Sequence, residues 1–208
     1  MSNYHQPLLP GQIYHLFSRA VGSEKLFITP DNYFFFLQKL KQHTASVCNF
    51  YCYSLLPNHF HLLARINDEE TIARHFEEVK KAKFNPEQHY ISDFVMERFS
   101  NFLNSYTKAF NKVNKRRGAL FMDYLRRSIV NKDSYFATFI WYIHKNAMHH
   151  SLSKTIGQWP YDSYKSLLSG APTSLLRTEL IDWFGGKESF IKFHQQEVQP
   201  KNLAIEDV

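Results

Sequence analysis

The segment 55–65 constrains the fold most, because it joins a tight turn to a long apolar run. Pro57 and Asn58 are typical turn residues, and the almost wholly apolar residues after them predict a β-strand. Side chains alternate between the faces of a strand, so His59 and His61 point to the same face. Two such imidazoles can bind one metal ion, but strand histidines that bind none fit the segment equally well.

Strand and helix patterns alternate along the first two thirds of the chain. Besides the strand after Pro57, β-like patterns predict strands over 11–19, 47–56 and 120–130. Helical spacing of apolar residues predicts helices over 33–43, 92–114 and 132–148, and Thr29-Pro30-Asp31 is a start signal for the first of them. This order predicts an α+β fold, a ferredoxin-like split βαβ arrangement. Its four-stranded antiparallel sheet would carry two helices on one face.

The length of 208 residues fits one well-cored domain with appendages. We expect one main domain over 1–170, in which the polar, mixed-charge segment 67–91 is an insertion. A small helical tail is expected over 171–208. Hydrophobic residues make up 44% of the chain and charged residues 21%, which is typical of a globular protein rather than a disordered one.

The balance of charge and aromatic residues allows a polyanionic partner. The net charge is +6 and aromatic residues make up 16% of the chain, a combination that suits single-stranded nucleic acid. No apolar run reaches the roughly 18 residues of a membrane span, and the first residues lack the features of a signal peptide. Cys48 and Cys52 do not have zinc-site spacing, so we expect buried thiols in a cytoplasmic protein.

The predicted helix over 132–148 holds a second group of chemical interest. Tyr142 and Asn146 are four residues apart and therefore share one helix face. A tyrosine can act as a nucleophile, and an amide oxygen can bind a hard cation. A half-buried aromatic residue and a surface amide would give the same pattern, and the helix alone favours that interpretation.

Blocks of residues along the chain resemble a known family in their order and spacing. They are Gly11-x-x-Tyr14-His15-x-x-x-Arg19, Leu56-Pro57-Asn58-His59-Phe60-His61-Leu62-Leu63 and Ser134-Tyr135-x6-Tyr142-Ile143-His144-x-Asn146. Weaker matches are Gly118-x-Leu120-Phe121-x4-Arg126-Arg127 and Trp159-Pro160-Tyr161-x-Ser163-Tyr164. Together they resemble the single-tyrosine transposases of the HUH-endonuclease superfamily, in particular the REP-associated branch. The resemblance covers roughly residues 11–168.

The resemblance implies a metal-dependent enzyme that cleaves and rejoins single-stranded or hairpin DNA. His59, His61 and Asn146 would hold a divalent ion, Mg²⁺ or Mn²⁺, and Tyr142 would form a 5′-phosphotyrosine intermediate. Relatives often carry Asn-Pro where this chain has Asn146-Ala147, so the helix is expected to continue further. The sequence does not decide between a monomer and a homodimer, or whether Tyr142 serves its own subunit.

Basic residues provide the candidate phosphate contacts, although a solvated basic face explains each of them almost as well. The candidates are Arg19, Lys112, Lys115, Arg116, Arg117, Arg126 and Arg127. Arg19 belongs to the first matching block and is expected beside the site. We predict packing roles for His15 and His144, and assign no role to His149 and His150.

Two other functions compete with this one. A DNA-hairpin-binding module derived from a transposase would keep the sheet and the basic surface without catalysis. A metal-dependent hydrolase would keep the histidines but would not need Tyr142. The chain retains His59, His61 and Tyr142 together, which favours the transposase-like enzyme.

Overall fold

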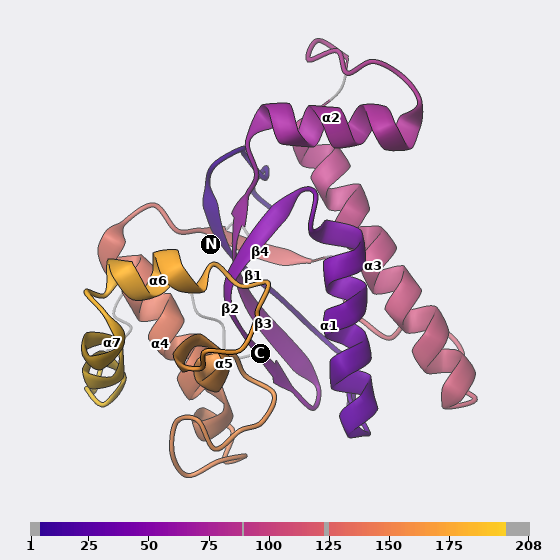
Figure 1. Cartoon of the computed structure of the whole chain (residues 1–208). Helices are drawn as coiled ribbons and strands as arrows, with labels where there is room; N and C mark the ends of the chain where they lie inside the picture. The colour runs from indigo at the N-terminus through magenta and orange to yellow at the C-terminus, as the bar shows by residue number, and fades with distance from the viewer. Residues whose placement is uncertain (1–4, 89, 123–124, 199–208) are drawn as a thin grey trace.

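The computed structural model describes residues 5–88, 90–122 and 125–198, which fold around one four-stranded sheet (Figure 1). Its strands are β1 (Ile13–Arg19), β2 (Cys48–Leu56), β3 (His59–Ile66) and β4 (Arg126–Ile129). The order across the sheet is β2-β3-β1-β4, and every neighbouring pair is antiparallel. This arrangement confirms the predicted ferredoxin-like α+β fold, in which β1 and β3 form the centre.

Two helices, α1 (Pro30–Thr44) and α3 (Ile91–Val113), cover one face of the sheet. Phe36 of α1 and Phe102 of α3 meet Phe60 of β3 in the buried cluster on this face. Helix α1 begins at Pro30, within the helix start that Thr29-Pro30-Asp31 predicts. Proline favours the first turn of a helix, and the Asn32 side chain accepts the backbone N–H groups of the two residues before the helix.

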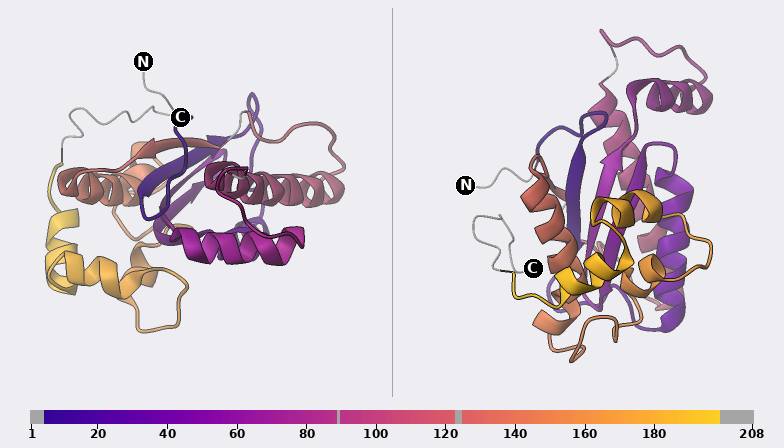
Figure 2. Two further views of the ribbon diagram at one scale, coloured as in Figure 1. Left: turned by 90° about the horizontal axis from the view of Figure 1, so that it is seen from above. Right: turned by 60° about the vertical axis from the view of Figure 1, so that its left-hand side comes forward.

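Helix α4 (Asp133–His149) packs against the opposite face of the sheet. The right-hand view of Figure 2 shows the sheet between α4 on one side and α1 and α3 on the other. Phe139 and Ile143 of α4 share a buried cluster with Cys52 and Leu63 of the sheet. The helix continues past Ala147, as expected where proline is absent.

The remaining helices lie around this three-layer core. Helix α2 (Glu69–Lys80) contacts α3, while α5 (Tyr164–Leu168), α6 (Arg177–Trp183) and α7 (Lys187–His194) follow α4. Leu180 of α6 and Phe190 of α7 belong to the same buried cluster as the apolar face of α4. The division into a catalytic domain and a separate tail stays a prediction.

The fourth strand differs most from its sequence-based prediction. Strand β4 is much shorter than the predicted range 120–130, because its ladder with β1 covers only Arg126–Ile129. Phe121 instead forms an isolated bridge to Ala20, and residues 123 and 124 lie outside the described part of the chain. Cys48 and Cys52 are buried free thiols, as predicted. Within the described residues, no helix is long and apolar enough to cross a membrane.

Candidate metal and nucleophile site

Strand β3 places His59 and His61 on the sheet face that α4 covers. In the ladder between β1 and β3, Arg19 lies opposite His59 and Phe17 lies opposite His61. Directly opposed residues project to the same face, so these four side chains line one surface. The histidines are 1% and 0% exposed, so any chemistry here takes place away from bulk solvent.

Helix α4 brings Tyr142 and Asn146 to the same two histidines. The Oδ1 atom of Asn146 lies 3.0 Å from Nε2 of His59. The ring of Tyr142 stands edge-on to the ring of His61, with 5.4 Å between centroids. The predicted ligands and the predicted nucleophile therefore meet in one place, at the contact between β3 and α4.

A fifth residue, His15 of β1, belongs to this group although the sequence predicted only packing for it. Its Nε2 atom lies 2.9 Å from Nδ1 of His61. The strand alternation of β1 had already placed His15 on the face of Arg19, but its pairing partner was unknown. We call His15, His59, His61, Tyr142 and Asn146 the site cluster.

The donor atoms of the site cluster fit a divalent ion. Nε2 of His61 is buried and has no hydrogen-bond partner. Nδ1 of His59 lies 2.8 Å from Asn58 Oδ1, which leaves its Nε2 facing Asn146. Adjacent ligands about 2.1 Å from one octahedral ion stand about 3 Å apart, as His59 Nε2 and Asn146 Oδ1 do. In the described residues, no group of three or more His, Cys, Asp or Glu side chains could hold a metal ion, so the predicted site depends on the amide oxygen of Asn146 as its third ligand.

Burial keeps the histidines of the site cluster neutral. It lowers the pKa of His15 to about 3 and that of His59 to about 4, and it holds the pKa of His61 well below its usual value. The hydrogen bond with Asn146 partly offsets the shift of His59, whereas the nearby charges of His150 and Arg19 add to it. Neutral imidazoles keep a lone pair at neutral pH, which metal binding requires.

The predicted DNA-contacting arginines have different surroundings. Arg19 lies next to His59, and its buried Nε atom has no hydrogen-bond partner. Arg126 lies opposite Phe17 on the same face of the sheet. Arg127 points to the other face, is 8% exposed and donates to the backbone carbonyls of His5 and Gln6. Alternation along β4 explains this split. The predicted DNA contact of Arg127 is therefore not supported, because its donors are engaged inside the fold.

The basic residues that follow the apolar part of α3 lie towards one end of the molecule. Lys112, Lys115 and Arg117 are exposed, whereas Arg116 is held by Glu24 at 3.2 Å. After this basic segment the chain passes the end of β1, where the backbone N–H of Met122 donates a hydrogen bond to the carbonyl oxygen of Arg19. In Figure 1 the C-terminal ends of α3 and α4 and the β2–β3 turn all lie at the lower end of the molecule.

Sequence reasoning assigned no role to His150, which lies at the edge of the site cluster. Its ring stands 4.6 Å from the ring of His59, centroid to centroid, and the residue is exposed. His150 is four residues after Asn146, and this spacing at the end of a helix was the available signal.

A second group of buried histidines uses the other side of α4. His144 lies 2.9 Å from His194 of α7 through Nδ1, and 2.9 Å from the Ser163 hydroxyl through Nε2. The remaining nitrogen of His194, Nδ1, donates to the Phe190 carbonyl at 2.8 Å. We call His144, Ser163 and His194 the tail cluster. It joins α4 to the C-terminal helices and leaves none of the four ring nitrogens without a partner.

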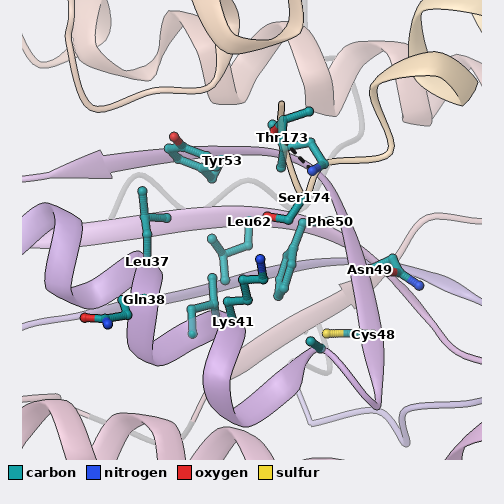
Figure 3. Close-up of a pocket in the computed structure, with 13 residues that line it drawn as sticks. Leu37, Gln38, Lys41, Cys48, Asn49, Phe50, Tyr53, Leu62, Thr173 and Ser174 are labelled. Carbon is teal, nitrogen blue, oxygen red and sulfur yellow. Dashed lines mark hydrogen bonds between the residues drawn. The ribbon is translucent and has the colours of Figure 1, made fainter. Parts of the chain in front are cut away.

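A cavity of about 320 Å³ lies on the opposite face of the sheet from the site cluster (Figure 3). Leu37 and Lys41 of α1, Phe50 of β2 and Leu62 of β3 line it together with the segment around Ser174. Because Leu62 alternates with His61 along β3, the sheet separates this cavity from the histidines. Its lining is mainly apolar, and it lies apart from the residues of the site cluster.

Comparisons with known proteins address the fold. No family model matches the chain, and no curated protein matches it in sequence. Among solved structures, a REP-associated tyrosine transposase bound to a REP hairpin is similar, with a TM-score of 0.58 and 12% sequence identity. The match covers 84% of this chain and 90% of that chain. At this identity the likeness concerns the arrangement of helices and strands, so the chain shares the fold of that tyrosine transposase.

Proposed function

We propose that this protein cleaves and rejoins one strand of single-stranded or hairpin DNA, with Tyr142 as the nucleophile. One observation carries the proposal: a single helix face brings Tyr142 and Asn146 onto the two same-face histidines of β3. A nucleophile, two neutral imidazoles and an amide oxygen are thereby concentrated in one buried place. The similarity to a transposase bound to a DNA hairpin supports the substrate class.

The reaction needs no nucleotide cofactor. The Tyr142 oxygen attacks the scissile phosphorus, the bond to the 3′-oxygen breaks, and that oxygen leaves as a hydroxyl after taking up a proton. The resulting 5′-phosphotyrosine conserves the phosphodiester energy, so attack by a 3′-hydroxyl reverses the step. A divalent ion, Mg²⁺ or Mn²⁺, held by His59, His61 and Asn146 would act as a Lewis acid on the phosphate.

The side chains around Tyr142 favour this chemistry. A free phenol has a pKa of about 10, so the attacking form needs nearby positive charge. Arg19 lies opposite His59, and its unpartnered Nε atom is available to a phosphate. Lys112, Lys115 and Arg117 provide exposed positive charge for the flanking DNA, which predicts binding that weakens steeply with salt.

Replacement of Tyr142 by phenylalanine tests the nucleophile. The protein would be incubated with a library of single-stranded hairpin DNAs and Mn²⁺, and covalent adducts would be detected on denaturing gels and by mass spectrometry. Tyr142→Phe should abolish the adduct, keep DNA binding and lower the free energy of unfolding by no more than about 1 kcal/mol. Tyr135→Phe is the matched control, because Tyr135 lies about 10 Å earlier along α4 and should not reach the same phosphate.

A hairpin-binding module without catalysis is the second candidate. Tyr142 is only 3% exposed, and a buried phenol favours a protein that binds DNA without attacking it. In that case native protein and Tyr142→Phe would bind the same hairpin equally and neither would form an adduct. An adduct mapped to Tyr135, or one that persists in Tyr142→Phe, would reject the proposed nucleophile.

A further inference from the structure

We propose that His15 is a positioning residue that sets the tautomer of His61 and so presents His61 Nε2 as a ligand atom. The inference rests on the proposed function, since it concerns the divalent ion that His61 would hold. Its basis is the 2.9 Å contact between His15 Nε2 and His61 Nδ1, together with the buried, unpartnered Nε2 of His61.

The hydrogen bond between the two rings has two arrangements. If His61 Nδ1–H donates to His15 Nε2, then His61 Nε2 carries a lone pair. If His15 Nε2–H donates to His61 Nδ1, the proton of His61 sits on Nε2 and blocks a metal ion. Only the first arrangement gives a ligand, and it requires an acceptor at the position of His15 Nε2.

The surroundings of His15 suit it to this role. Its ring is 1% exposed and packs against Phe17 and Phe139, with centroid distances of 4.9 and 4.7 Å. These apolar neighbours offer no other hydrogen-bond partner, and Nδ1 of His15, which carries the ring proton in the first arrangement and a lone pair in the second, has none. The contact with His61 is therefore the hydrogen bond that orients this ring.

Two substitutions separate the hydrogen bond from the packing. His15→Phe keeps an aromatic ring between Phe17 and Phe139 but removes the acceptor. His15→Gln loses the ring but offers an amide oxygen to His61 Nδ1. A purely structural role predicts that phenylalanine is tolerated better, whereas a positioning role predicts that glutamine is.

The experiment measures Mn²⁺ affinity of the full chain by calorimetry, without DNA, and thermal unfolding of each variant. Native protein should bind one ion, His15→Phe should bind it about 10- to 100-fold more weakly, and His15→Gln should recover most of the loss. Equal affinity in native protein and His15→Phe overturns the inference and leaves the proposed function standing. Native protein that binds no Mn²⁺ rejects the metal site itself, and the inference with it.

A second measurement decides the matter if His15→Phe does not fold. Imidazole ¹⁵N spectra of native protein with Mg²⁺ should show the proton of His61 on Nδ1 and a lone pair on His15 Nε2. A proton on His15 Nε2 in the loaded protein would overturn the inference.

Discussion

The site cluster and the tail cluster are both made of buried histidines held by α4, yet they satisfy their polar atoms differently. In the tail cluster, each nitrogen of His144 and His194 has a hydrogen-bond partner. In the site cluster, Nε2 of His61 and Nδ1 of His15 have none. Burial lowers the pKa of the histidines in both clusters, so the pKa direction does not distinguish them.

This difference identifies the buried histidines that keep a ring nitrogen available to a ligand. An unpaired polar atom in the interior raises the free energy of the folded state, and most native proteins avoid it. A bound ion would remove that cost at His61, whereas nothing remains to be removed in the tail cluster. We therefore expect the site cluster to control chemistry and the tail cluster to control stability.

The largest expected effect separates the two clusters by activity. His59→Ala should reduce metal-dependent DNA cleavage to background, because it removes one ligand and the partner of Asn146. The free energy of unfolding should change by less than about 2 kcal/mol, since no large apolar cavity opens. His75→Ala on α2, outside both clusters, is the control. Normal cleavage by His59→Ala would show that the site cluster does not hold the ion.

The opposite result is expected from the tail cluster. His194→Leu leaves Nδ1 of His144 buried without a partner, which should cost about 3 kcal/mol of unfolding free energy in urea titrations. DNA cleavage at low temperature should persist, because α4 still carries Tyr142 and Asn146. Lys192→Ala, an exposed position of α7, is the control. A variant as stable as native protein would show that the tail cluster does not stabilise the fold.

The tail cluster should also make the fold sensitive to acid. Burial lowers the folded-state pKa of His194 from 6.5 to about 4, so the unfolded chain binds the extra proton in this range. The stabilisation is fully present above pH 6.5 and is lost as the pH falls towards 4. About 2 kcal/mol should disappear between pH 7 and pH 5. His194→Leu should lack this part of the pH dependence; identical pH profiles would contradict the assignment.

The smallest expected effect on stability concerns a buried carboxyl group near the tail cluster that, unlike the histidines there, has an unpaired polar atom. Asp162 is 5% exposed, its Oδ2 atom has no partner, and burial raises its pKa to about 7. Ionisation therefore destabilises the fold as the pH rises from the unfolded pKa near 3.8 through 7. Asp162→Asn keeps the side-chain oxygen that accepts from the Tyr164 amide, and its advantage over native protein should grow by about 1 kcal/mol between about pH 6.2 and pH 8.

Urea unfolding at the two pH values measures this difference. Asp182→Asn, at an exposed position of α6, should show no such growth. A constant difference between Asp162→Asn and native protein would mean that Asp162 is already ionised in the folded protein across this range.

The sequence by itself determined which side chains share a face. Period-two alternation put His59 and His61 on one side of β3, and the four-residue spacing put Tyr142 and Asn146 on one side of α4. It also separated Arg126 from Arg127 without showing which of them points inward. These are local properties, because the geometry of a strand or a helix fixes them within a few residues.

Only the tertiary structure decided what each face meets. Docking of α4 on the sheet face opposite α1 brought Asn146 to His59, and the register of β1 on β3 brought His15 to His61. The pairing of β4 with β1 placed Arg127 opposite Leu16, on the sheet face away from the site cluster and inside the fold. These contacts join residues far apart in the chain, and their partners follow from strand pairing and helix packing, which local periodicity does not encode.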